Sequence, residues 1–267
     1  MLGMLEITEL VKRYGGGAPV LQGLDLSVSG NSVVAIIGSS GAGKSTLLRC
    51  INRLVEPTSG SIRLAGVELT TLRGGELRRA RRRIGMVFQG FNLLERLTVM
   101  ENVLAGRLGY VGFPAALLRR YPQQDVDRAY ALLQRVGLAK YVNTRADALS
   151  GGERQRVGVV RALMQEPEIL LADEPTASLD PKTADGIMHL LRDLAAELSL
   201  PVLINIHNVV QAKENAQRIV GLRHGVIIFD GTPDQLDREA FDRIYEGDEK
   251  AAAEAMGAGR SPGTVSA

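Results

Sequence analysis

Several features that secreted, membrane-spanning or nucleic-acid-binding proteins commonly use are scarce in this sequence. The single cysteine, Cys50, excludes an internal disulfide and fits a reducing compartment. No stretch approaches the roughly 20 consecutive apolar residues that a membrane-spanning helix needs. The net charge of +2 gives no overall attraction to nucleic acid. The opening "MLGMLEITEL" has acidic residues where a signal peptide has a basic region, so we expect a soluble, cytoplasmic chain.

The pattern of apolar residues predicts a parallel α/β core preceded by antiparallel strands. Residues 5–14 and 24–30 alternate apolar and polar side chains, as half-buried strands do, and residues 60–69 have the pattern of a hairpin. Continuous apolar runs, typical of buried parallel strands, occur at residues 32–38, 84–89, 168–175 and 201–207. A helix is expected at residues 182–198 and two short strands at residues 218–225 and 226–231.

Residues 91–157 have helical patterns and no clear strand, so a helical lobe interrupts the parallel βα units. We expect one domain at residues 4–247. Its core and β subdomain would occupy about residues 4–90 and 158–247, and its helical subdomain about residues 91–157. The small, polar segment 248–267 is expected to be a disordered tail.

The strongest functional signal is the stretch "GSSGAGKS" at residues 38–45, which fits the pattern G-x-x-x-x-G-K-[ST]. Its glycines let backbone N–H groups point at phosphate oxygens, and the helix that follows adds positive charge at its N-terminus. Lys44 can reach the β- and γ-phosphates, and the Ser45 hydroxyl can ligate Mg²⁺. An ordinary glycine-rich turn is the alternative, but a buried strand before it and a helix after it favour nucleoside triphosphate binding.

Two adjacent carboxylates end the apolar run "ILLADEP". Asp173 would hold Mg²⁺, usually through water. Glu174 would lie beside the γ-phosphate and orient or deprotonate the attacking water. The alternative is that one of these carboxylates only caps the turn that begins at "EPT".

A second glycine turn occurs in "LSGGERQRV" at residues 149–157. Ser150 and Glu153 stand three positions apart before an apolar-periodic helix, which predicts a capping box. A capping box does not require the two glycines, Gly151 and Gly152. They suggest close approach of the backbone to an anion at a helix N-terminus, either a second ligand or the nucleotide of a second copy.

The order of the motifs "GSSGAGKST", "VFQG", "LSGGERQ", "ILLADEP", "SLD" and "INIH" resembles that of the ATP-binding cassette (ABC) ATPases, over about residues 4–246. The resemblance implies an α/β fold with a P-loop NTPase (RecA-like) parallel-sheet core, an N-terminal antiparallel β subdomain and an inserted α-helical subdomain. It also implies that two copies pack head to tail around two ATP molecules. The residues expected to contact ATP in trans are Ser150, Gly151, Gly152, Glu153 and Asp180.

The same resemblance assigns roles to further positions. Tyr14 matches the aromatic residue that stacks on adenine, although it can also be a plain strand-end tyrosine beside "GGG". Gln89 matches the glutamine that touches Mg²⁺ and the attacking water, with a polar strand end as the alternative. His207 matches the histidine that contacts the γ-phosphate, whereas His189 and His224 are expected to be ordinary residues.

The implied site therefore has three overlapping sets. Catalytic residues are Glu174, His207, Gln89 and Lys44. The metal ligands are Ser45, Gln89 and Asp173. The ATP-binding residues of the same chain are Tyr14, Gly38, Ser39, Ser40, Gly41, Ala42, Gly43, Lys44, Ser45 and Thr46. The cofactors are thus ATP and Mg²⁺.

Three uses of this ATPase compete. The first is the cytoplasmic engine of a membrane transporter, the second a soluble cassette ATPase acting on nucleic acid or ribosomes, and the third a P-loop kinase. A kinase leaves "LSGGERQ" and "SLD" unexplained. The run "RRARRR" at residues 78–83 is the one argument for nucleic acid, but such helical runs are usually a solvated face, and no aromatic residues interleave to stack bases. The transporter is therefore preferred, and no nucleic-acid partner is expected.

Residues 88–110 resemble the matching segment of phosphonate importer ATPases in their "FNL", "RLTV" and "NVLAGRLG" features. This resemblance implies a phosphonate-transporting ATPase that works as a homodimer at the cytoplasmic face of the inner membrane, with two integral-membrane permease subunits and an external binding protein. Other phosphorus oxyanions, such as phosphite or phosphate, are the next alternative, followed by lipoprotein-release or amino-acid systems. One position departs from the family: Val210 stands where an Asp often lies, three residues after the histidine.

Overall fold

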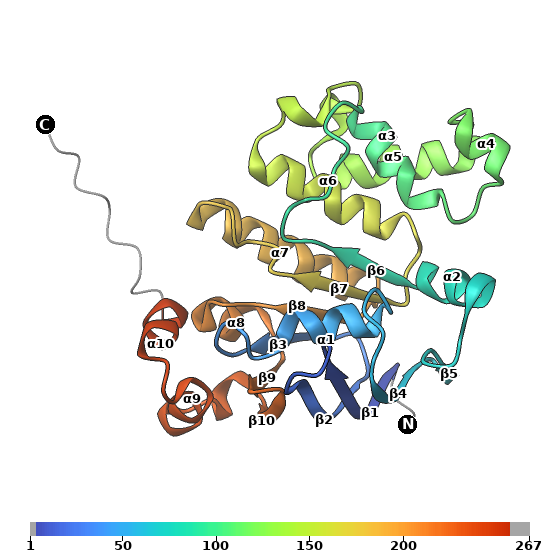
Figure 1. Cartoon of the computed structure of the whole chain (residues 1–267). Coiled ribbons are helices and arrows are strands. Elements are labelled where there is room, and N and C mark those ends of the chain that lie inside the picture. The colour runs from blue at the N-terminus through green and yellow to red at the C-terminus, as the bar shows by residue number, and fades with distance from the viewer. Residues whose placement is uncertain (1–3, 257–267) are drawn as a thin grey trace, which may run out of the picture.

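The computed structural model describes residues 4–256, which contain two β-sheets (Figure 1). The strands of the smaller sheet are β1 (Leu5–Arg13), β2 (Pro19–Val28), β4 (Ser59–Leu64) and β5 (Val67–Glu68). They lie in the order β2-β1-β4-β5, and each neighbouring pair whose register is defined is antiparallel. The predicted antiparallel strands and hairpin are therefore confirmed.

The larger sheet has six strands. These are β3 (Val33–Ile37), β6 (Ile84–Val87), β7 (Ile169–Asp173), β8 (Val202–Asn205), β9 (Arg218–Arg223) and β10 (Val226–Gly231). Their order is β10-β9-β3-β8-β7-β6, and all pairs are parallel except the edge pair β10–β9. Every residue of β3, β6, β7 and β8 is buried, as continuous apolar runs in a covered parallel sheet require.

Helices cover this sheet and form a separate layer above it (Figure 1). They are α1 (Lys44–Ile51), α2 (Gly74–Arg82), α3 (Val99–Leu104), α4 (Phe113–Leu117), α5 (Gln123–Arg135), α6 (Gly151–Leu163), α7 (Pro181–Glu197), α8 (Val209–Asn215), α9 (Arg238–Tyr245) and α10 (Glu249–Ala255). No strand lies between β6 and β7 in the described chain, as the sequence predicts. Helix α6 runs unbroken through residue 157, so the expected edge of the helical subdomain falls inside one helix rather than at a loop.

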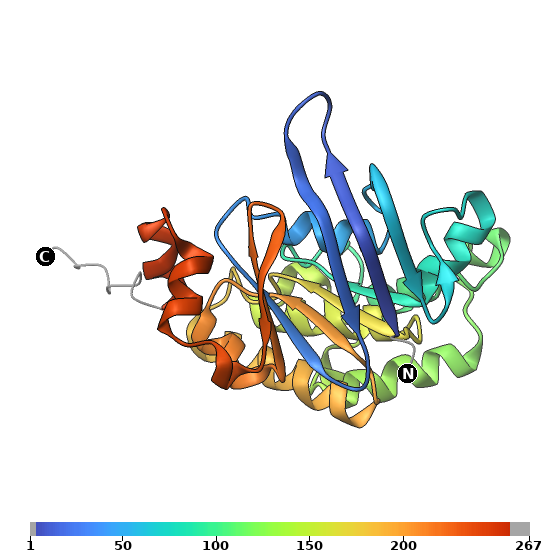
Figure 2. The ribbon, with the colours of Figure 1, turned by 90° about the horizontal axis from the view of Figure 1, so that it is seen from below.

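Side chains of β3 alternate between the two hydrophobic cores because successive residues of a strand point to opposite faces. Val33, Ala35 and Ile37 pack with the apolar residues of α6 and α7. Val34 and Ile36 pack with α1 and the antiparallel sheet. Figure 2 shows the antiparallel sheet lying across the parallel sheet on the side away from α3–α6. Helix α1 is thus held between the two sheets, and residues 38–43 connect the end of β3 to its first residue.

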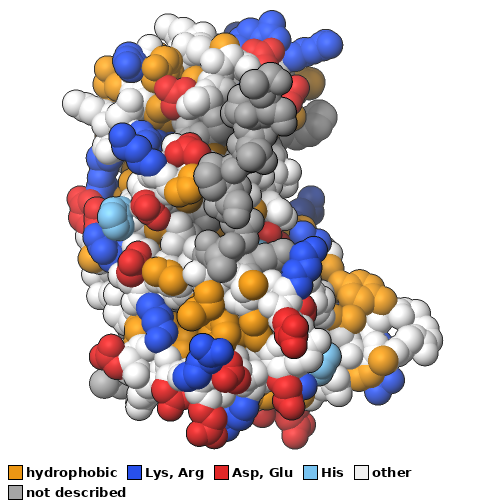
Figure 3. Space-filling model, turned by 90° about the vertical axis from the view of Figure 1, so that its left-hand side faces the viewer, with side chains coloured by type: hydrophobic (Ala, Val, Ile, Leu, Met, Phe, Trp, Pro, Cys, Tyr) orange, Lys and Arg blue, Asp and Glu red, His pale blue; other side chains and the backbone are white. Residues whose placement is uncertain are grey.

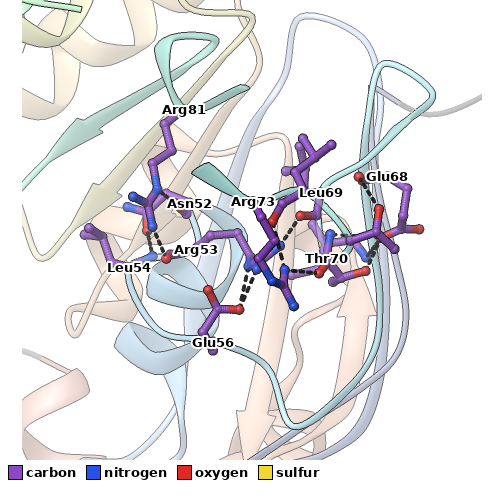
Figure 4. A network of polar contacts seen from close by, with 12 residues as sticks. Asn52, Arg53, Leu54, Glu56, Glu68, Leu69, Thr70, Arg73 and Arg81 are labelled. Carbon is purple, nitrogen blue, oxygen red and sulfur yellow. Dashed lines mark hydrogen bonds and ion pairs between the residues drawn. The ribbon is translucent and has the colours of Figure 1, made fainter. Parts of the chain in front are cut away.

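A polar network fastens the far end of α1 to the antiparallel sheet and to α2 (Figure 4). Arg53 is fully buried, and its guanidinium donates to the carbonyl of Leu69 and to Glu56 Oε2. Arg81 of α2 in turn donates to the backbone carbonyls of Asn52, at 3.1 Å, and of Arg53. The network fixes the helix whose opposite end carries the glycine loop.

The basic run at residues 78–83 is only partly a solvated face, which corrects the expectation. Arg81 belongs to the network above. Arg82 lies over the ring of Tyr110, at 4.9 Å from its centroid, and Arg83 donates to both carboxylate oxygens of Glu168 at 2.6–2.7 Å. Half of the run therefore has partners within the chain.

The expected disordered tail is wrong for its first part. Residues Glu249–Ala255 form α10, and Ala255 is buried in the larger core. The remainder of the expected tail, residues 257–267, lies outside the described residues. Within residues 4–256, no helix has the length and apolar character that crossing a bilayer requires.

Candidate functional site

The glycine loop joins the end of β3 to the start of α1, as the motif predicts. Gly38, Gly41 and Gly43 have φ values of 147°, 83° and 103°, which side chains rarely tolerate. A Cβ on Gly38 would also lie 2.1 Å from the carbonyl oxygen of Leu222 in β9. These glycines are therefore required by the loop's curvature and by its close packing on the sheet.

Lys44 spans this loop. Its ammonium donates to the carbonyl oxygens of Gly38 at 2.6 Å and Ser39 at 3.0 Å, and the residue is only 4% exposed. Burial lowers the pKa of Lys44 to about 8, while the carboxylates of Glu174 and Asp173 oppose that shift. A buried cation inside a loop of backbone N–H groups is suited to polyphosphate oxygens.

Ser45 and Asp173 come together at the carboxyl end of the sheet. The Ser45 hydroxyl donates to Asp173 Oδ1 at 2.7 Å, and Arg49 lies 3.3 Å from Asp173 Oδ2. Asp173 is 3% exposed at the end of β7. A hydroxyl and a carboxylate are the hard oxygen ligands that Mg²⁺ takes from proteins when phosphates and waters complete its octahedron, so this pair fits the metal.

Gln89 does not join this pair. It follows β6 with an exposed side chain, and among the described contacts it makes no hydrogen bond with Ser45 or Asp173. Its assignment as a metal ligand and catalytic residue stays a prediction.

Glu174 and His207 form the second close pair. Oε1 of Glu174 lies 2.6 Å from Nε2 of His207, which follows the end of β8. This hydrogen bond is the main reason that the pKa of Glu174 lies below its usual value. Glu174 also has φ of 49°, a left-handed conformation that costs energy in a non-glycine residue and often occurs at functional sites.

The predicted capping box at the start of α6 is confirmed. The Ser150 side chain accepts from the Glu153 N–H, and the Glu153 carboxylate accepts from the Ser150 N–H at 2.8 Å. Gly152 has a reason within the chain as well: a Cβ there would lie 2.4 Å from the methyl carbon of Thr183. The glycine therefore permits close packing of α6 on α7, whatever the turn binds.

The residues expected to act in trans lie near one another through this contact. Asp180 caps α7, with Oδ1 accepting from the Thr183 N–H at 3.1 Å. The beginning of α6 packs on that same Thr183 through Gly152. In the described part of the chain, no hydrogen bond joins the glycine loop to the residues expected to act in trans, which are Ser150, Gly151, Gly152, Glu153 and Asp180.

Tyr14 directly follows β1. It is the first residue of the turn between β1 and β2, and it is 51% exposed. The ammonium of Lys12 lies 4.7 Å from the centroid of its ring. An exposed ring at a hairpin tip is available for stacking, and its role stays a prediction.

Val210, the departure from the family pattern, lies on α8 beside an apolar hollow of about 320 Å³. Val209, Phe241 and Met256 also line this hollow. Helices α8, α9 and α10 lie on the left in Figure 1, the side that faces the viewer in Figure 3. Val210 is 45% exposed, and Lys213 and Arg238 also line the hollow, so nothing in the structure explains the valine.

Sequence reasoning missed Asn205 and Arg49. Asn205 is fully buried at the end of β8, and its Nδ2 donates to Ser45 Oγ at 3.1 Å and to Asp173 Oδ1 at 2.9 Å. The available signal was a single polar residue within the apolar run "PVLINIH". For Arg49, the sequence offered only its position one helical turn after Ser45 on α1, which places both side chains on the same face of the helix.

Comparisons with known proteins agree with this geometry. The family described as "ABC transporter" matches residues 21–177. "Phosphonates import ATP-binding protein PhnC 1" of Ruegeria sp. (strain TM1040) is 70% identical over 91% of this chain and 95% of its own length. "Phosphonates import ATP-binding protein PhnC" of Bordetella parapertussis is 57% identical over 93% of this chain and 98% of its own length.

Two solved structures share the fold. The post-hydrolysis dimer of the cassette MJ0796 bound to ADP and Pi has a TM-score of 0.74 and 34% identity, over 86% of this chain and 99% of that one. The ADP conformation of the cassette MJ1267 has a TM-score of 0.80 and 27% identity, over 93% and 100%. With the motifs, their geometry and the family match in agreement, the chain belongs to the ABC transporter family as an ATP-hydrolysing cassette.

Proposed function

We propose that this chain is the ATPase subunit of a phosphonate importer. The observation that carries the substrate class is the similarity to proteins named for phosphonate import, at 54–70% identity over more than nine tenths of this chain. Because the match spans more than nine tenths of this chain, it includes the helical layer as well as the ATP site.

The site supports hydrolysis by positioning and electrostatics. The glycine loop and Lys44 would bind the phosphates, and Ser45 with Asp173 would hold Mg²⁺, which neutralises developing phosphate charge when bound. Glu174 would accept a proton from the attacking water, since its carboxylate is ionised at neutral pH and its pKa lies below the usual value chiefly through the His207 hydrogen bond. His207 fixes the direction of that carboxylate through the 2.6 Å hydrogen bond.

The working unit is proposed to be a head-to-tail homodimer. Support comes from the dimeric MJ0796 cassette with ADP and Pi, and from the exposure of two of the five residues assigned to act in trans. Ser150 and Asp180 are exposed, and both stand at helix N-termini, where N–H groups attract anions. A second copy would thus place its α6 turn against the phosphates bound by the first.

Transport partners would dock on the helical layer. Leu94, Leu117 and Leu118 are 58–71% exposed there, so this layer presents apolar side chains to a partner. We assign this surface to two integral-membrane permease subunits, which would hold the chain at the cytoplasmic face of the inner membrane. An external binding protein would deliver the phosphonate. A nucleic-acid role loses its main support, because Arg81, Arg82 and Arg83 have partners within the chain.

Growth of a deletion strain tests the proposal. Phosphonate, phosphite or phosphate would be the sole phosphorus source, and the strain would receive the native chain or the Lys44→Ala variant. Loss of growth on phosphonate alone, restored by the native chain only, is the expected result. Loss on phosphite or phosphate instead would favour the oxyanion alternative, and normal growth on all three would reject uptake of these compounds.

A further inference from the structure

One polar residue, Asn205, interrupts the apolar strand β8. It is fully buried, lies between β3 and β7, and pairs in register with Ile36 and Asp173. The strand is otherwise Val202, Leu203 and Ile204. A leucine would fit such a strand without bringing a polar group into the interior. The presence of an amide here therefore requires an explanation from its contacts.

The amide nitrogen of Asn205 completes a triangle with the two proposed metal ligands. Nδ2 lies 3.1 Å from Ser45 Oγ and 2.9 Å from Asp173 Oδ1, and those two oxygens lie 2.7 Å apart. The backbone of the same residue accepts from the Glu174 N–H at 3.2 Å. Asn205 thus contacts the groups that bind metal and the backbone that carries the catalytic carboxylate.

The direction of this amide follows from donor and acceptor chemistry. An ionised Asp173 can only accept hydrogen bonds, so the nitrogen of Asn205 must face it. Ser45 gives its own proton to Asp173 and therefore accepts from Nδ2. As a result Oδ1 of Asn205 is buried with no hydrogen-bond partner among the described residues. Native proteins seldom leave a buried acceptor unpaired, and such exceptions concentrate at functional sites.

We propose that Asn205 is a positioning residue of the magnesium site. Its two N–H groups hold the Ser45 hydroxyl and the Asp173 carboxylate in the arrangement that receives the metal. The inference rests on the proposed ligation of Mg²⁺ by Ser45 and Asp173. Residues that orient metal ligands typically change metal affinity by about 10–100-fold when they are replaced.

The test is the Asn205→Leu variant of the full chain, which keeps the side-chain size and removes both donors. We expect the Mg²⁺ concentration for half-maximal ATPase activity to rise about 10-fold or more. We also expect the affinity for a fluorescent ATP analogue in EDTA to stay within about twofold of the native value. The increase in that affinity on adding Mg²⁺ should be lost. An unchanged Mg²⁺ requirement and an unchanged gain would overturn the inference.

Asn215→Leu is the matched control. Asn215 is also a buried asparagine with an unpaired Oδ1, but its Nδ2 donates to the Gln211 carbonyl within α8 at 2.9 Å. Its replacement should leave both magnesium readouts unchanged. Equal effects of Asn215→Leu and Asn205→Leu would indicate a general loss of packing and would reject a positioning role.

Ser45→Ala separates failure of the inference from failure of the metal assignment. If Ser45→Ala raises the Mg²⁺ requirement and Asn205→Leu does not, only the inference falls. If Ser45→Ala has no effect, the proposed ligation falls and the inference with it. If Asn205→Leu shows no cooperative melting in EDTA, the variant is not folded, and Asn205→Thr takes its place in the experiment. Its hydroxyl can donate one hydrogen bond, so a smaller rise in the requirement is expected, and no rise would overturn the inference.

Discussion

The Glu174 carboxylate lies 2.6 Å from Nε2 of His207, at the ends of two neighbouring parallel strands. Glu174 has a left-handed backbone, with φ of 49°, and its carboxylate is held by a histidine that follows a different strand, β8. The hydrogen bond lowers the pKa of Glu174 below its usual value and restricts the rotation of its carboxylate.

Glu174→Gln should keep ATP binding and lose hydrolysis. The amide has the same shape but accepts no proton from water, so we expect the turnover rate to fall about 10²–10⁴-fold. Because ATP then persists, the proposed dimer should stay closed. Size-exclusion chromatography with and without saturating ATP measures this, and a monomer at saturating ATP would count against the head-to-tail dimer.

His207→Ala should separate catalysis from nucleotide binding. Without its main hydrogen-bond donor, Glu174 should protonate at a higher pH, because its pKa is below the usual 4.5 chiefly through His207. We therefore expect a lower turnover rate whose acid limb moves to higher pH, with ATP affinity changed less than about threefold. In His207→Gln the side chain can still donate a hydrogen bond to Glu174, so the acid limb of the turnover rate should move back part of the way toward lower pH. An acid limb identical in all three proteins would contradict the role assigned to His207.

Short-range chemistry made much of this site predictable. The glycine loop, the capping box of Ser150 and the buried parallel strands follow from local residue patterns, and the structure has each of them. Contacts between distant segments left no such signal. The triangle of Asn205 with Ser45 joins positions 160 residues apart, and the packing of Gly152 on Thr183 depends on how α6 meets α7. The helix α10 was missed although its alanines favour a helix, because seven residues are too few to show a clear apolar periodicity.

Gly152→Ala should destabilise the chain although alanine favours helices. Its Cβ would lie 2.4 Å from the Thr183 methyl carbon, a clash that forces α6 and α7 apart. We expect a loss of about 1–3 kcal/mol in unfolding free energy by denaturant titration. Thr183→Ser removes that methyl and should partly restore the double variant.

Gly186→Ala on α7 is the control for the prediction at Gly152. A Cβ at Gly186 meets nothing within 4 Å, so alanine there should stabilise the helix by about 0.5–1 kcal/mol. Equal effects of alanine at the two positions would show that the packing of α6 on α7 is not the cause.

Glu68 should contribute to acid stability in the antiparallel sheet. Burial alone would raise its pKa, but hydrogen bonds from Ser61, Thr70 and the Ile62 N–H lower it to about 2. Because the folded pKa is depressed, the stabilisation is complete above the unfolded value of about 4.5 and is lost as pH falls toward 2. Stability of Glu68→Gln, measured by denaturant titration between pH 5 and 2, should therefore change less steeply with pH. A slope equal to that of the native chain would exclude this role.

Charge reversal on the helical layer should separate transport from hydrolysis. Between residues 95 and 101, Glu101 is a poor choice because it completes the capping box of α3 with Thr98 and pairs with Arg119. Glu95 is exposed, and within residues 4–256 its hydrogen bond comes from the backbone: its carbonyl accepts from Asp147 N at 3.1 Å. Glu95→Lys therefore changes the surface without removing a side-chain contact. In a purified complex with the permease subunits, we expect uptake to fall severalfold while basal ATPase activity stays within about twofold, because the carboxylate lies outside the phosphate-binding groups and beside the proposed docking surface. Parallel loss of uptake and ATPase activity would place Glu95 in the machinery of hydrolysis, and unchanged uptake would move the permease surface elsewhere on the helical layer.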